Sequence, residues 1–287
     1  MKPFVTPAWR KKIIRNSFRR KDHVINQAVS QMESAMKKAV SLIVDHAMNT
    51  GEFHEPPMHE MFNVSEHFYR SVLRSAFQTC EEEKAQQKGK RRLAAGPLPT
   101  GLPKTLRDME KVFRDRRYWP KIMKRSNKLV EGLRKAYLKK LKRKFGDLLP
   151  EILAGRVSPE EAKKRMMSAW DATKSRVETV FRTETTKYFA KTQVAYFNND
   201  PEIIGFLFDS IPDKDRTNVC KTRHGLIYRP GTTGKTGLDY NTPALHWNCR
   251  SHLIALANTP HNRKMLEDPQ RDPKRKAVAP LPPRWRK

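Results

Sequence analysis

Apolar residues recur at helical spacing through most of the first two-thirds of the chain. In VINQAVSQMESAMKKAVSLIVDHAM (24–48) they stand three and four positions apart, which is the pattern of a helix with one buried face. A second stripe repeats at every fourth position: Leu129, Leu133, Tyr137, Leu141 and Phe145. Patterns of this length predict long helices that bury one face and expose lysine and arginine on the other.

The boundaries of these helices follow from turn-forming residues. NTGEFHEPP (49–57) ends the first stripe with a glycine and two prolines. We expect a break over FGDLLPEILAGRVSPEE (145–161), after which Ser158 caps a new helix that has proline in its first turn. That helix is expected to end near Asn199, because Asp200-Pro201 does not continue a helix.

The sequence changes character after residue 201. EIIGFLFDSI (202–211), HGLIYRP (224–230) and SHLIAL (251–256) are rich in Ile, Leu, Phe and Tyr and predict short strands. PDKDRTNVC (212–220) predicts a turn followed by a helical turn. The final thirty residues contain six prolines and nine Lys/Arg against three acids, so we expect an extended tail that orders only against a partner.

The predicted fold class is therefore α+β: a mainly helical N-terminal two-thirds with long basic helices, a small β-containing C-terminal module and an extended basic tail. The expected organisation has five segments: a helical region 1–87, a linker 88–105, a long-helix region 106–200, an α+β module 201–257 and a tail 258–287.

The charge of the chain bears on its partners. Lys+Arg number 59 and Asp+Glu 30, which gives a net charge of +29, and a strongly basic protein most often binds nucleic acid. No apolar run reaches the roughly 18 residues of a membrane span, and the first residues lack the apolar core of a cleaved leader. With three cysteines, we expect a reducing compartment rather than a disulfide framework.

One stretch carries the densest positive charge. Residues 107–146 hold sixteen Lys/Arg and four Asp/Glu, and such a helix can bind duplex DNA through phosphates without reading its sequence. The candidate DNA-binding residues are Lys139, Lys140, Lys142, Arg143 and Lys144. The alternative is a solvated helix face, but residues 1–24 repeat the bias with eight basic residues and one acid.

Cysteines and histidines are closely spaced in the C-terminal module. Cys220 and His224 form a C-x3-H pair, and His246 and Cys249 form an H-x2-C pair 21 residues later. Thiolates and imidazoles at short spacing suit a structural Zn²⁺ site, with His252 as an alternative ligand. Three other interpretations stay open: packed thiols with locally bonded histidines, a Cys220–Cys249 disulfide, and a nucleophilic Cys249 with His246 as its base.

Residues 180–256 contain a series of motifs in a distinctive order. Arg182-Thr183-Glu184 is followed by Gly205, Asp215-x-Thr217-x2-Cys220, Gly225 and Tyr228, and then by Pro243-x2-His246-x-Asn248-Cys249-Arg250. This order resembles the phage Mu F-like minor head proteins, also called phage head morphogenesis proteins. One departure stands out: the family motif usually ends C-R-C, whereas this chain has Ser251 in the last place. A fourth metal ligand would then have to come from His252 or His224.

The resemblance implies a minor structural protein of a tailed-phage head, made in the host cytoplasm and located in the virion, at the portal vertex or head interior. Its expected partners are the portal protein, the major capsid protein or scaffold, and double-stranded DNA, with no membrane. Alternatives are a cellular non-specific DNA-binding protein and an ADP-ribosyltransferase-like enzyme. The enzyme would need a Glu-x-Glu pair, and none follows residue 200. Gly231-x2-Gly234-Lys235-Thr236 lacks full P-loop spacing, so we expect no catalytic role.

Overall fold

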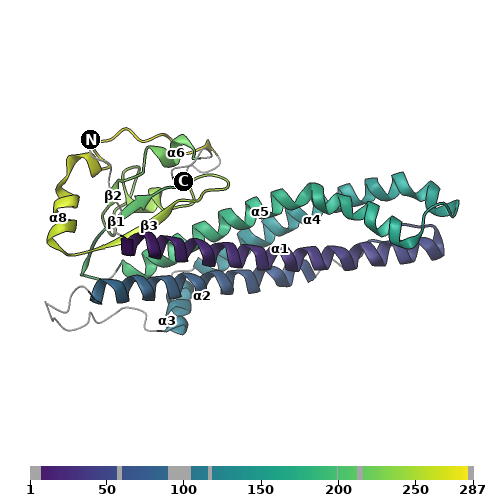
Figure 1. The fold of residues 1–287 in the computed structure, drawn as a ribbon, viewed down its shortest axis with the longest axis horizontal. Coiled ribbons are helices and arrows are strands. Elements are labelled where there is room, and N and C mark those ends of the chain that lie inside the picture. Colours follow the sequence, from purple (N-terminus) through teal and green to yellow (C-terminus); the bar gives the residue numbers. More distant parts are fainter. Residues whose placement is uncertain are drawn as a thin grey trace. The chain divides into compact units, whose positions relative to one another are not determined.

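The computed structural model describes residues 8–56, 60–89, 105–115, 118–198, 200–211 and 216–283 of the 287-residue chain. Within these ranges, five helices precede the first strand (Figure 1): α1 (Ala8–Thr50), α2 (Glu60–Gly89), α3 (Leu106–Asp115), α4 (Tyr118–Leu153) and α5 (Pro159–Phe197). The long helices predicted from the apolar stripes are therefore confirmed.

The C-terminal part contains the strands. The elements after α5 are β1 (Ile203–Asp209), α6 (Asn218–Lys221), β2 (Ile227–Tyr228), α7 (Leu238–Asn241), β3 (His252–Ala257) and α8 (Pro260–Glu267), followed by a 3₁₀ turn at Pro269–Arg271. The strands form one antiparallel sheet in the order β2-β1-β3. β1 and β2 lie within stretches that the sequence predicted to be strands, and β3 extends one residue beyond its predicted stretch, to Ala257; the α+β class is confirmed.

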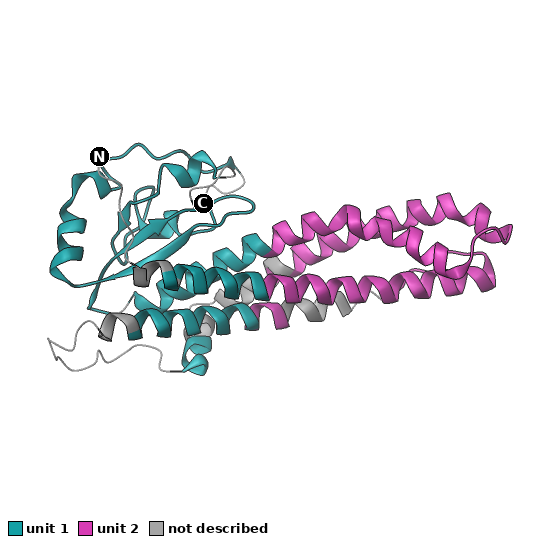
Figure 2. Cartoon of the chain, in the orientation of Figure 1, with its two compact units in different colours: residues 1–23, 71–116, 182–287 teal, residues 24–70, 117–181 magenta. Residues whose placement is uncertain are grey.

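The chain divides into two compact units (Figure 2). Unit 1 comprises residues 1–23, 71–116 and 182–287, and unit 2 comprises residues 24–70 and 117–181. These units differ from the contiguous segments expected from the sequence, because α1, α2 and α5 each contribute residues to both units. The expected linker, 88–105, lies almost wholly outside the described residues.

Unit 2 is a helical unit whose core is formed by the apolar stripes. Tyr137 of α4 is buried against Trp170 of α5, with ring centroids 6.4 Å apart. The ring of Phe53, which follows α1, packs against that of Phe145 of α4, with ring centroids 5.2 Å apart. Edge-to-face ring pairs of this kind add to the free energy gained by burying their area.

The sheet of unit 1 has a continuous apolar core on one face. Leu207 of β1 pairs with Ile254 of β3 on one side and with Ile227 of β2 on the other, and these three residues form one buried cluster with Leu256 and with Met265 of α8. Gly205 permits this packing, because a Cβ at that position would lie 2.7 Å from Ile227 Cγ2.

A buried carboxylate contacts β3, which is an edge strand of the sheet. Glu83 of α2 is fully buried; one carboxylate oxygen accepts a hydrogen bond from the backbone N–H of Ala255 at 2.8 Å, and the other accepts from Nε2 of Gln193 at 2.7 Å. The unpaired backbone groups of an edge strand can pair with another chain. Glu83 accepts one of these N–H groups, that of Ala255, and so joins α2, α5 and the edge of the sheet within unit 1.

Two predictions about local structure need correction. The break expected over 145–161 is confined to residues 154–158, because α4 continues through Pro150 to Leu153. Pro150 stands in the last turn, where its missing N–H removes only one helical hydrogen bond, and both Leu148 and Ile152 are buried. The expected cap is confirmed: the N–H of Glu161 donates to Oγ of Ser158 at 3.2 Å.

The second correction concerns the tail. Residues 258–287 were expected to be extended, but Thr259 caps a helix, α8, whose Met265 is buried. Further along, Leu281 is buried, and the carbonyl of Ala279 accepts a hydrogen bond from the guanidinium of Arg223 at 2.8 Å. The few buried apolar residues of the tail, such as Met265 and Leu281, lie far apart in sequence and pack against the rest of unit 1, so they form no apolar period.

Candidate metal centre

Three potential metal ligands meet in unit 1. Cys220 lies on α6, a single helical turn, and His246 and Cys249 lie in the loop between α7 and β3. The Sγ atom of Cys220 is 3.0 Å from Nε2 of His246 and 3.7 Å from Sγ of Cys249. All three ligand atoms lie within 4.8 Å of one another. Two sulfurs and one imidazole nitrogen at this spacing can hold a metal ion.

The orientation of the His246 ring makes its Nε2 atom available to bind a metal. Its Nδ1 lies 2.6 Å from the carbonyl oxygen of Trp247, and a carbonyl can only accept, so Nδ1 carries the proton. Nε2 then faces the two sulfurs. A histidine ligand commonly donates its other ring N–H to a backbone carbonyl, which fixes the tautomer and the ring plane.

The pKa values of the two thiols are shifted in opposite directions. Burial opposes ionisation of Cys249, but hydrogen bonds from Cys220 and His246 hold the pKa of Cys249 well below its usual range. The hydrogen bond to Cys249 and burial raise the pKa of Cys220. Burial lowers the pKa of His246, yet hydrogen bonding to Cys249 raises it overall. The cluster therefore favours a thiolate at Cys249, and a divalent cation bound here would displace the remaining protons of the ligand atoms.

Helix α5 holds the loop that carries His246 and Cys249. The hydroxyl of Thr186 donates to the carbonyl of Cys249 at 2.8 Å, and the hydroxyl of Thr183 accepts from the N–H of Asn248 at 2.8 Å. The guanidinium of Arg182 donates to Oδ1 of Asn248 at 3.1 Å. Asn248 has a φ of 58°, a conformation that asparagine tolerates better than most residues.

The other two predicted ligands lie outside the cluster. Nδ1 of His224 is 3.2 Å from the backbone nitrogen of Ser210 and 3.3 Å from Oδ1 of Asp209. His252 is buried on β3, where its Nδ1 lies 3.5 Å from Oγ of Ser17 of α1. Both histidines had suitable sequence spacing, but each side chain is held by a different set of neighbours.

A small cavity adjoins the cluster on the side of Cys220 and His246. Its volume is about 20 Å³, and its walls include Ser210, Thr217 and Ser251. Ser251 is 2% exposed and donates a hydrogen bond to the Cys220 sulfur. The cavity can hold one water molecule, which needs roughly 10–15 Å³.

No family model, no curated protein and no solved structure matches this chain. None of the described helices combines the length and the apolar character that a membrane span requires.

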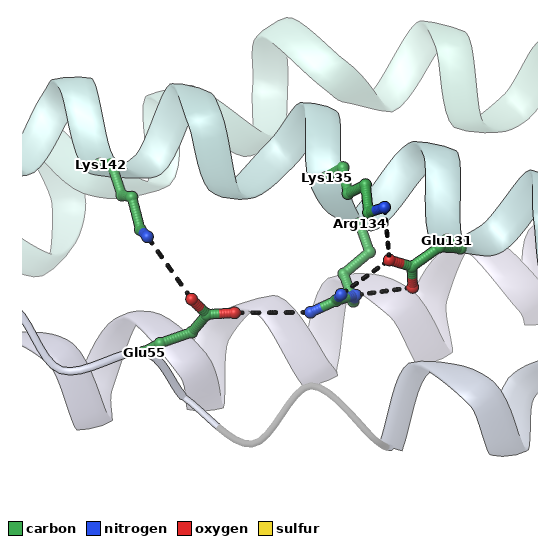
Figure 3. A network of polar contacts seen from close by, with 5 residues as sticks. All are labelled: Glu55, Glu131, Arg134, Lys135 and Lys142. Carbon is green, nitrogen blue, oxygen red and sulfur yellow. Dashed lines mark hydrogen bonds and ion pairs between the residues drawn. The ribbon is translucent and has the colours of Figure 1, made fainter.

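The structure separates the predicted DNA-binding residues into two groups. Lys142 pairs with Glu55 at 3.5 Å (Figure 3), and Lys140 donates to the carbonyl of Ala172 at 2.8 Å. Lys139 and Arg143 are exposed, Lys144 is half-buried, and none of these three side chains has an ion-pair partner among the described residues. Among the described residues, the charge on this part of α4 that no carboxylate neutralises is thus carried by Lys139, Lys140, Arg143 and Lys144.

Figure 3 shows why Lys142 differs from its neighbours. Glu55, in the segment after α1, lies between Lys142 and Arg134 and contacts each at 3.5 Å. Arg134 in turn makes a two-pronged contact with Glu131 at 2.7 and 2.9 Å. These contacts join the segment after α1 to α4 within unit 2, so Lys142 has a structural partner already.

Sequence reasoning missed two residues that shape the centre. Thr186 anchors the Cys249 carbonyl, and its only sequence signal is its place one turn after Thr183 on the helix. Lys21 of α1 is also buried; burial lowers its pKa to about 8, and the charge of Cys249 opposes this shift. Lys21 gave no signal, because it stands in a run of basic residues near the N-terminus.

Proposed function

We propose that this chain is a minor structural protein of a tailed-bacteriophage head, located at the portal vertex or head interior, where it contacts the packaged DNA. The observation that carries the proposal is the meeting of the motif residues. Arg182 and Thr183 contact Asn248 across more than sixty positions of sequence, and Cys220 contacts His246 and Cys249. Six of the residues on which the resemblance rests thus form one connected group: Arg182, Thr183, Cys220, His246, Asn248 and Cys249. Asp215, which belongs to the same motif, lies outside the described residues.

The glycines of the motif also have physical roles. Gly205 allows β2 to approach β1 closely, and Gly225 has a φ of +83°, a conformation that side chains disfavour. Proteins that share this fold would need the same residues at these positions, which supports the resemblance.

Mass spectrometry of purified particles tests the proposed location. We expect the chain at low copy number in gradient-purified, nuclease-treated virions, and cross-linking in the same particles should join it to the portal protein, the major capsid protein or scaffold. Particles that contain no trace of this chain would contradict the proposal.

We also propose that Cys220, His246 and Cys249 bind Zn²⁺ as a structural cofactor. The donor set suits zinc, which favours thiolate and imidazole ligands. The ion would join α6 to the loop before β3, and in a small module such a link adds directly to the free energy of unfolding.

Metal analysis of two cysteine variants tests the zinc proposal. We expect zinc in the purified protein and in Cys80→Ser, because Cys80 is buried on α2 outside the cluster. Cys249→Ser should lose the metal, and its melting temperature should no longer respond to a chelator. Equal metal content in Cys249→Ser and Cys80→Ser would refute the site.

A further inference from the structure

We infer that a solvent molecule, rather than a fourth side chain, completes the metal centre, and that it occupies the cavity beside Ser251. The inference rests on the zinc proposal and adds the chemistry of the fourth coordination position. It gives the protein a metal ion with an exchangeable oxygen ligand.

The first argument is the ligand count. Zinc takes four ligands in tetrahedral sites, and the structure brings three side chains within 4.8 Å of one another. His224 is occupied by Asp209 and the Ser210 backbone. His252 is buried beside Ser17 and is absent from the cluster. Among the described residues, one coordination position therefore has no protein ligand.

The second argument is the cavity. Its walls include two of the proposed ligands, Cys220 and His246, so it adjoins the place where the ion would sit. Its volume of about 20 Å³ suits one water molecule.

The third argument is the polar lining of this cavity. Oγ of Ser210 is buried and has no hydrogen-bond partner among the described residues. A buried hydroxyl without a partner destabilises the folded protein unless a water molecule or an ion forms a hydrogen bond or contact with it. A water bound to the metal would contact this hydroxyl, and Thr217 adds a second hydroxyl to the walls of the same cavity.

Ser251 explains why the position is open. It is 2% exposed, lines the same cavity and contacts the sulfur of Cys220. A serine hydroxyl is a weak zinc ligand compared with a thiolate. The Ser251→Cys substitution would place a sulfur where the solvent molecule is expected, with the same number of side-chain heavy atoms.

X-ray absorption spectroscopy of the zinc-loaded full-length protein tests the inference. We expect two sulfurs at about 2.3 Å, one imidazole, and one further oxygen at about 2.0–2.2 Å. Ser251→Cys should show three sulfurs and one imidazole, whereas Ser251→Ala should keep the wild-type spectrum. His224→Ala and His252→Gln should also keep it. So should Asp213→Asn and Asp215→Asn, which test the carboxylates between the cavity-lining residues Ile211 and Arg216, outside the described residues; a change in the oxygen shell of either variant would overturn the solvent ligand.

Zinc affinity, measured by chelator competition, provides a second readout. A partner that only hydrogen-bonds to a metal ligand changes zinc affinity by roughly 10–100-fold. A new direct ligand should matter at least as much, so we expect the thiolate of Ser251→Cys to tighten zinc binding by about tenfold or more. A wild-type spectrum with two imidazoles, or one altered by His224→Ala or His252→Gln, would overturn the solvent ligand and leave zinc in place. A protein that takes up no metal would overturn both proposals.

Discussion

Five charged residues of unit 1 are buried: Lys21, Glu83, Glu184, Asp200 and Arg223. Glu83 and Arg223 are compensated by direct hydrogen bonds, to Ala255 and Gln193 in one case and to Asn241, Val219 and Ala279 in the other. Lys21 has weaker compensation. Its ammonium lies 5.1 Å from the ring centre of Phe18 and 4.9 Å from that of Phe189, and cation–π contacts recover only part of the cost of burial.

Burial lowers the pKa of Lys21 from 10.5 to about 8, although the charge of Cys249 acts to raise it. Below pH 8 the folded protein must keep this charge buried, which lowers the free energy of unfolding. Between pH 8 and 10.5 the unfolded chain binds the proton and the folded chain does not, so stability rises with pH.

We therefore expect Lys21→Met to raise the free energy of unfolding at pH 7 by up to about 3 kcal/mol, since one pKa unit is worth about 1.4 kcal/mol. The gain should shrink as the pH rises through 8 to 10.5. Urea unfolding across this range measures it, with the exposed Lys274→Met as control. A gain that does not change with pH would show that lost charge is not its cause.

At the scale of elements, helix ends are set by single side chains. Ser158 caps α5 through the N–H of Glu161, and Glu160 and Glu161 place negative charge in the first turn, where the helix dipole favours it. By contrast, α4 passes through Pro150 because burial of Leu148 and Ile152 outweighs one missing hydrogen bond.

Removing the cap of α5 should destabilise unit 2. We expect Ser158→Ala to lower the free energy of unfolding by about 1 kcal/mol, which is the usual cost of losing such a cap. Ser175→Ala is the matched control, because Ser175 is exposed in the middle of the same helix and alanine is a better helix former there. Equal effects of the two substitutions in chemical denaturation would argue against the cap.

At the scale of the whole molecule, the dominant property is the net charge of +29. A positive surface binds duplex DNA by releasing counterions, so affinity falls steeply with salt. Not every basic residue contributes equally, since Lys142 already pairs with Glu55, whereas Lys139 and Arg143 have no ion-pair partner among the described residues.

We expect the double substitution Lys139→Ala/Arg143→Ala to weaken binding to a short duplex and to reduce the slope of log affinity against log salt by about 1.8, or about 0.9 for each lost phosphate contact. Lys142→Ala should change the slope much less. Fluorescence anisotropy in rising KCl measures both. A salt-independent affinity, or equal effects of the two variants, would contradict the role assigned to this part of α4.

The sequence by itself determined the long helices, the Ser158 cap and the three strands. These features depend on apolar period and turn chemistry, which are local properties of the chain. Only the tertiary structure decided that Cys220 meets His246 and Cys249 across more than twenty-five positions, that His224 and His252 lie outside the cluster, that α8 forms in the tail and that Lys142 is paired. Those outcomes depend on which distant side chains compete for each group, such as Asp209 for His224 and Glu55 for Lys142, and no local pattern records that competition.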